Sequence, residues 1–184
     1  PILLEGDLNG RREARLSRLR GELVEGDRRI ELDCPGVIHS REAVDTPIGL
    51  SRDATIVLSD GGLICVACAR PPGSERHSAE EAIAAISHPG GYLDFDQVLL
   101  STEYDANGRQ RRATLELWPA SEEIAALHGA GSVVSGCTAK VGTARINTAL
   151  FRWTLDGHDG LGRYEIRAGS AAAANAEETT GTPA

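Results

Sequence analysis

The sequence predicts an all-β protein, an antiparallel barrel or sandwich that is built from successive hairpins and carries one or two short helices. Short apolar or alternating runs recur along the 184 residues, and turn signals separate them at short intervals. Four of these units share the plan of strand, tight turn and strand. Hairpins in succession favour an antiparallel sheet that closes or folds on itself.

The first hairpin is predicted at residues 19–34. Its second strand, RRIELDC (28–34), alternates charged with apolar residues, and this period of two is typical of a half-buried strand. The apolar positions are Ile30, Leu32 and Cys34. The segment EGDR (25–28) suits a tight turn, which makes LRGELVE (19–25) the expected partner strand.

Three further hairpins follow the same plan, at residues 54–69, 97–118 and 150–167. The first of them turns through Asp-Gly-Gly, and the second through Asn107-Gly108, which is a strong hairpin signal. The third turns within residues 156–160, which read Asp-Gly-His-Asp-Gly.

Two segments are predicted as short helices. In SAEEAIAAIS (78–87), Ser78 could cap the first turn, where Glu80 and Glu81 are favourable, and Pro89-Gly90 would end the helix. Residues 121–129 are a weaker candidate. We expect a lead-in segment at 1–14, one β-domain at 15–168, and a disordered tail at 169–184, because that tail is small, polar and low in complexity.

Composition excludes some partners and favours others. The net charge is −8 and the pI is near 5.1, so the chain lacks the concentrated positive charge that nucleic acids require. The sequence contains no uninterrupted apolar run of ~18 residues, so no membrane span is predicted. Four cysteines are few for a disulfide framework, and we expect reduced thiols in the cytoplasm.

Local motifs offer little chemistry. Cys65 and Cys68 have a redox or zinc spacing, but on a strand residues three apart face opposite sides, so we interpret both thiols as core residues. The five histidines form no ligand pair, and we predict neither a metal nor a cofactor. His39 and Ser40 are adjacent strand residues that point apart, so they cannot serve each other directly as base and nucleophile.

A cavity between the strands is the kind of site that suits a β-barrel, since such pockets are mostly apolar with a few polar groups. The candidate ligand-binding residues are Tyr92, Tyr104, Trp118, Trp153 and Tyr164. The alternative interpretation is that these side chains fill the core.

The order of hairpins and turns resembles the lipocalin-like domains of the hydroxyneurosporene synthase (carotenoid hydratase) and AttH-like superfamily. In particular, the chain resembles the C-terminal domain of uncharacterised two-domain members. The closing segment is the most telling, because an Asp-Gly, Gly-x-Gly, Glu pattern is matched there by Asp156, Gly157, Gly160, Gly162 and Glu165. Segments 21–40, 54–68, 90–93 and 105–117 also carry the resemblance.

The resemblance implies a bulky hydrophobic ligand, such as a terpenoid, steroid or polyketide-like compound, and cofactor-free hydration or isomerisation. Family members typically carry an Asp-His-Ser-Trp-Gly box, and this chain has Ile-His-Ser-Arg-Glu at 38–42. His39 would then transfer the proton, with Ser40 or Glu42 assisting. Because the Asp and Trp are replaced, the alternative is a non-catalytic domain that packs on a preceding β-domain of the same protein.

Overall fold

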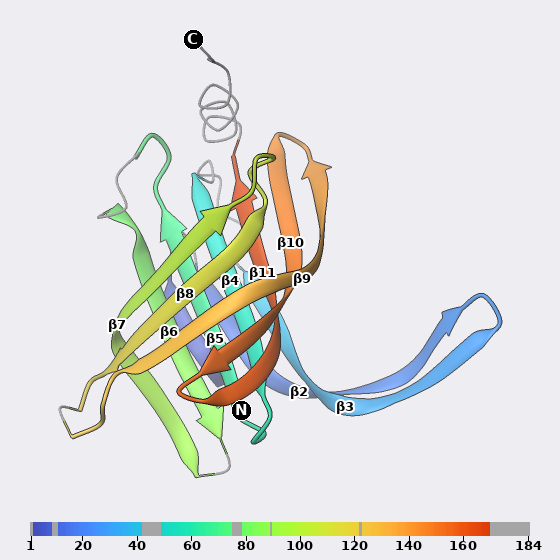
Figure 1. Cartoon of the computed structure of the whole chain (residues 1–184), viewed down its shortest axis with the longest axis horizontal. Coiled ribbons are helices and arrows are strands. Elements are labelled where there is room, and N and C mark those ends of the chain that lie inside the picture. The colour runs from blue at the N-terminus through green and yellow to red at the C-terminus, as the bar shows by residue number, and fades with distance from the viewer. Residues whose placement is uncertain are drawn as a thin grey trace.

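The computed structural model describes residues 2–8, 11–41, 49–74, 79–88, 90–121 and 123–169. Its strands are β1 (Ile2–Asp7), β2 (Arg11–Glu25), β3 (Arg28–Arg41), β4 (Leu50–Leu58), β5 (Leu63–Arg70), β6 (Glu81–His88), β7 (Gly91–Tyr104), β8 (Gln110–Pro119), β9 (Leu127–Val141), β10 (Ala144–Leu155) and β11 (His158–Ala168). Strands β4 to β11 close into an antiparallel barrel in the order β10-β11-β4-β5-β6-β7-β8-β9 (Figure 1). A separate three-stranded sheet has the order β1-β2-β3.

The four predicted hairpins are confirmed as β2/β3, β4/β5, β7/β8 and β10/β11. The β10/β11 hairpin turns at Asp156 and Gly157, whose φ angles are 44° and 86°. Two consecutive residues with positive φ are what a two-residue hairpin of this twist requires, and Asp-Gly adopts that conformation readily. The first hairpin differs from expectation in one respect, because it belongs to the separate sheet and not to the barrel.

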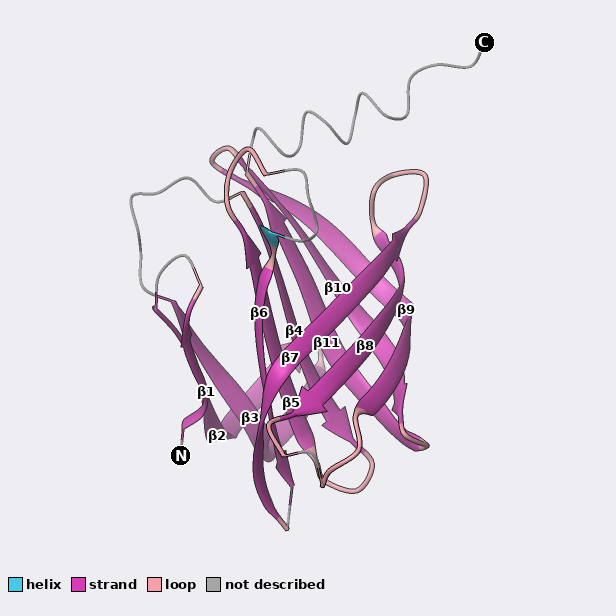
Figure 2. Ribbon diagram, turned by 90° about the vertical axis from the view of Figure 1, so that its left-hand side faces the viewer, coloured by secondary structure: helices cyan, strands magenta, loops and turns pink. Residues whose placement is uncertain are grey.

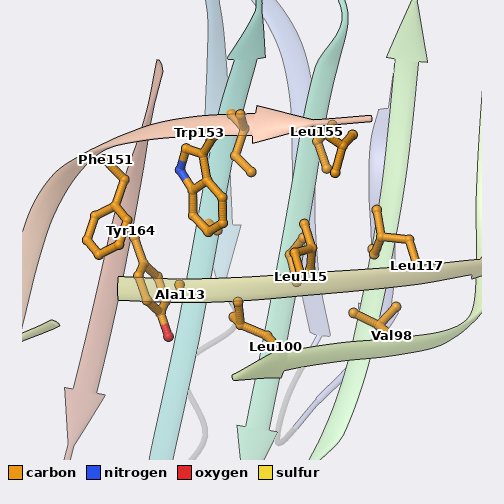
Figure 3. Close-up of a cluster of buried hydrophobic side chains, with 14 of the residues drawn as sticks. Val98, Leu100, Ala113, Leu115, Leu117, Phe151, Trp153, Leu155 and Tyr164 are labelled. Carbon is orange, nitrogen blue, oxygen red and sulfur yellow. The ribbon is translucent and has the colours of Figure 1, made fainter. Parts of the chain in front are cut away.

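The barrel interior is filled by apolar side chains from all eight strands. Trp153, Phe151 and Tyr164 form its centre, and all three are fully buried (Figure 3). The ring centroid of Phe151 lies 5.6 Å from that of Trp153 and 5.4 Å from that of Tyr164. Aromatic pairs at these separations add to the hydrophobic stabilisation that burial itself provides.

Gly131 makes room for the largest of these side chains. A Cβ atom at Gly131, in β9, would lie 2.7 Å from the indole ring of Trp153, a residue directly across the ladder in β10. The segment GAGSVVSG (129–136) therefore runs as a barrel strand, and its glycine lets an indole approach the backbone.

The three-stranded sheet packs against the outside of the barrel along β5 and β6 (Figure 2). A second apolar cluster fills this interface, with members on both sides. They are Leu3, Leu4, Leu8 and Ala14 from the sheet side, and Leu63, Cys65, Ala67, Ala69 and Ala85 from the barrel. Strand β5 is thus buried on both faces, which explains why LICVACA is an unbroken apolar run.

The outer part of the β2/β3 hairpin projects beyond the barrel as a long arm (Figure 1). One face of this arm carries ion pairs, in which Arg18 contacts Asp33 and Arg29 contacts Glu22. The other face is apolar. Leu19 and Leu23 on that face are 53% and 52% exposed.

The helix predicted at 78–87 is wrong, because residues 81–88 form strand β6 between β5 and β7. Ala84 and Ile86 point into the barrel, whereas Ala85 and Ile83 contact the outer sheet. Since both faces are covered, the segment needs no polar face, and its alanine-rich pattern fits a helix as well as a strand. Pairing with two neighbours overrides the local helix propensity.

The weaker helix predicted at 121–129 is also wrong. Strand β9 begins at Leu127, which pairs with Leu117, and the described residues before it form a loop. No described residue belongs to an α-helix. That part of the chain consequently contains no helix long and apolar enough to cross a membrane. Residues 170–184 of the predicted tail lie outside the described residues, and residues 2–7 of the predicted lead-in form β1.

Candidate functional site

A cleft lies where the three-stranded sheet crosses the barrel wall, and its volume is about 90 Å³. Its walls come from β1, β2 and β3 on one side and from β4, β5 and β11 on the other. The lining residues are Leu4, Arg12, Glu13, Ala14, His39, Ser40, Arg41, Asp53, Val66, Ala67, Arg163, Glu165 and Arg167. Two of the predicted catalytic residues, His39 and Ser40, are therefore at this cleft, outside the barrel.

His39 is held against the barrel by a hydroxyl group. It lies in β3 opposite Ala14, and its Nε2 is 2.9 Å from Thr55 Oγ1 in β4. Partial burial of the imidazole, followed by the positive charge of Arg163, lowers the pKa of His39 below its usual 6.5, although Asp53 and Glu165 act in the opposite direction. The ring is consequently neutral at pH 7, and the tautomer decides which of the two groups donates the hydrogen bond.

Protonation of His39 should destabilise the fold. Because its pKa is lower in the folded chain than in the unfolded chain, the unfolded state binds the proton more readily, and stability falls as the pH decreases below 6.5. We expect an NMR titration of the His39 ring to give a pKa below the usual 6.5. In His39→Gln, the part of the acid-induced loss of stability that belongs to His39 should vanish, and an unchanged pH profile would contradict this assignment.

Arginine side chains give the cleft its charge. Arg12 is only 5% exposed, and its Nη1 donates to Asp53 Oδ1 at 2.5 Å. Glu165 accepts from Arg163 at 2.9 Å, from Arg167 at 2.6 Å and from Thr148 at 3.0 Å. Burial of Glu165 opposes its ionisation, but these hydrogen bonds and charges prevail and hold its pKa below the usual value.

A shallow groove with a volume of about 390 Å³ lies beside the cleft on the outer face of the barrel. It runs over β9, β10 and β11, and Arg163 lines both the cleft and the groove. The remaining groove residues are Ser135, Gly136, Cys137, Thr148, Ala149 and Leu150. Two exposed apolar side chains, Val57 and Leu161, lie next to the groove. They are opposite each other on β4 and β11, two residues along from the Thr55–Arg163 pair on the same face.

Of the five residues predicted to bind ligand, Trp153 and Tyr164 are brought together, with ring centroids 6.4 Å apart, and the five do not line one site. Trp153 and Tyr164 point into the packed barrel, whereas Tyr104 lies at the rim and is 44% exposed. Tyr92 lies outside the barrel, where its hydroxyl donates to the Leu3 carbonyl. Trp118 is also on the outer face, where its ring packs edge-on against His128 with the centroids 6.4 Å apart.

The other predicted residues are placed as follows. Ser40 lines the cleft beside His39, and Glu42 lies outside the described residues. The expectation that Cys65 and Cys68 are core residues on opposite faces is confirmed, since Cys68 is in the barrel interior and Cys65 is in the outer cluster. Burial raises the pKa of each thiol to about 12, and all four cysteines are free.

Sequence reasoning missed most of the cleft. Asp53, Thr55, Arg163 and Glu165 alternate with buried residues along β4 and β11, which is the pattern of an ordinary solvent-facing strand surface. The signal that could have found them was the charge pattern itself, with Arg163, Glu165 and Arg167 all on one face of β11. Their role depends on the outer sheet folding back over β4, which no local pattern encodes.

The described residues thus form a lipocalin-like closed β-barrel with an added outer sheet. A similar solved structure is the crystal structure, at 2.00 Å resolution, of a candidate AttH protein from Nitrosomonas europaea. The TM-score is 0.62 at 15% identity, and the similarity covers 93% of this chain and 58% of that chain. The chain therefore has an AttH-like fold. No protein-family model and no curated protein match it.

Proposed function

We propose that the protein binds a bulky hydrophobic small molecule, such as a terpenoid, steroid or polyketide-like compound, in the outer groove and the adjoining cleft. The observation that carries this proposal is that Arg163 lines both spaces and so places them side by side. The groove has the size of a small-ligand site, and apolar side chains adjoin it. The barrel interior is a poorer candidate, because Trp153, Phe151 and Tyr164 occupy its centre.

The cleft also supplies groups for cofactor-free acid–base chemistry. A neutral His39 can accept a proton from the ligand near pH 7 and return that proton in a later step, and Thr55 orients its ring. Ser40 lines the same space, and Arg163 is positioned to stabilise negative charge that develops on a ligand. We therefore assign the proton transfer of a hydration or isomerisation to His39.

Retinol, a terpenoid alcohol, is a suitable probe of the groove. At a concentration about 100 times its Kd, a ligand of the native state stabilises by about 2.7 kcal/mol, so we expect the melting temperature to rise by about 5–10 °C. Leu150→Glu should abolish this rise, because it places a charge in the groove. Leu99→Glu is the matched control, since Leu99 is an exposed leucine on β7. No rise in the native chain, or equal rises in both variants, would contradict the groove as the site.

A second candidate function rests on the arm. Leu19 and Leu23 expose an apolar face on a hairpin whose opposite face is ion-paired, which suits a sheet that is covered by a second β-domain. A maleimide should label Leu23→Cys rapidly in a chain whose exposed Cys137 and half-buried Cys34 are replaced by Ser. In a chain that is extended by a preceding β-domain, labelling should slow by about tenfold or more as the side chain becomes buried. Equal labelling rates would remove this candidate.

A further inference from the structure

The positive charge of the cleft exceeds what its carboxylates compensate. Four arginines line it, namely Arg12, Arg41, Arg163 and Arg167, against the carboxylates Glu13, Asp53 and Glu165. Asp53 is paired with Arg12, and Glu165 is shared by Arg163 and Arg167. Glu13 forms an ion pair with Arg15, which is not a lining residue, but its buried Oε1 accepts no hydrogen bond within the described residues.

Two guanidinium groups consequently keep unused hydrogen-bonding capacity. Within the described ranges, Arg41 has no ion-pair partner. Its pKa is lowered first by burial and then by the charges of Arg12 and Arg167, although the carboxylate of Asp53 acts in the opposite direction. Arg12 is almost completely buried, yet its Nη2 has no hydrogen-bond partner in the described part of the chain. A buried charged N–H group without an acceptor is unfavourable, and an incoming anion would remove that penalty.

The size of the cleft limits what can enter. The cleft volume of about 90 Å³ is less than a quarter of the groove volume of about 390 Å³, so the cleft suits a small polar group such as a carboxylate better than a bulky apolar body. The apolar body of a ligand would have to stay in the groove beyond Arg163. Guanidinium groups bind carboxylates with paired, charge-assisted hydrogen bonds, so this arrangement suits an acid with an apolar body.

We propose that the cleft binds the ionised carboxylate of an amphipathic acid, with Arg12 and Arg41 as its principal donors. This inference rests on the proposed function, because it defines the polar end of the ligand whose apolar end occupies the groove. It narrows the ligand class to apolar carboxylic acids, and a neutral alcohol of the same carbon skeleton is disfavoured.

Calorimetric titration with retinoic acid and retinol tests the carboxylate site separately from the binding of an apolar ligand in the groove. We expect the native chain to bind the acid at least about tenfold more tightly than the alcohol. In Arg41→Gln this preference should shrink to within about twofold, with the affinity for retinol unchanged. Arg109→Gln is the control, since it removes an exposed arginine that does not line the cleft and should keep the preference. If Arg41→Gln loses its β-sheet circular dichroism signal, Arg41→Lys takes its place, because it keeps the charge but removes the paired donors of the guanidinium group.

The outcomes are distinguishable. Equal affinities in the native chain would overturn the carboxylate site while leaving the proposed function intact. If neither compound binds, the proposed function fails. Inorganic phosphate then tests whether the cleft binds an anion at all. A higher melting temperature in phosphate than in chloride at equal ionic strength, seen in the native chain and absent in Arg41→Gln, would support an anion site. The absence of any difference would overturn it.

Discussion

Trp153→Ala should destabilise the protein by about 3–5 kcal/mol, close to the upper end for a single core substitution. The indole is fully buried in the barrel centre and contacts Phe151 and Tyr164. It also lies directly against Gly131, where any side chain would collide with it. Its removal leaves a cavity that a closed barrel cannot collapse to fill. Urea denaturation followed by circular dichroism would measure the change in the free energy of unfolding.

The chain's other tryptophan provides the control. Trp118 is half-buried on the outer face of β8, so Trp118→Ala should cost distinctly less than Trp153→Ala. If the two variants lost similar stability, or if Trp153→Ala bound retinol in the new cavity in preference to the groove, the description of the interior as a filled core would be wrong.

Glu80→Gln should cost about 3–5 kcal/mol, because it leaves the Arg52 guanidinium buried without its counter-ion. The Arg52 side chain is 3% exposed and that of Glu80 is 10% exposed. Arg52 Nε donates to Glu80 Oε1 at 2.9 Å and Nη1 donates to Thr102 at 3.2 Å, while Thr102 in turn lies 2.5 Å from the hydroxyl of Tyr164. The pair thus anchors a polar network at one end of the barrel.

Chemical denaturation of two further variants distinguishes this mechanism from a general charge effect. Glu103→Gln breaks an exposed pair with Arg111, and we expect a loss of about 0–1 kcal/mol. The double variant Arg52→Leu, Glu80→Leu removes both charges, and it should be clearly more stable than Glu80→Gln. If the double variant were the less stable one, the cost would not come from an unpaired buried charge.

The strands of the four hairpins were predictable from their apolar runs and the turn signals between them, whereas β9, which precedes the Gly142 turn, was not predicted as a strand. Period-two alternation located the first part of β3 at 28–34, Asn107-Gly108 marked the turn between β7 and β8, and Asp156-Gly157 marked the turn between β10 and β11. The method failed at β6, where both faces are covered and the residues EAIAAI carry no alternation. It also could not separate the barrel from the outer sheet, because a hairpin looks the same whichever sheet it joins.

The candidate site was predictable only in part. His39 and Ser40 were found from the box at 38–42, and both are at the cleft. The arginines that surround them come from β2, β3 and β11, which are distant in sequence and meet only through the packing of the outer sheet. The aromatic residues were misleading guides, because an aromatic side chain on a strand fills a core, as Trp153 does, or covers an outer face, as Trp118 does.

Chemical-shift mapping with retinol tests most directly whether the ligand is held on the outer wall of the barrel. Two-dimensional NMR of the isotopically labelled chain would follow the backbone amides and the tryptophan indoles during the titration. We predict that the largest shifts fall on Thr55, Leu150 and Arg163, with small changes at Leu115 and at the Trp153 indole. The largest shifts at Leu115 and Trp153, with the outer residues unchanged, would place the ligand inside the barrel and contradict the account.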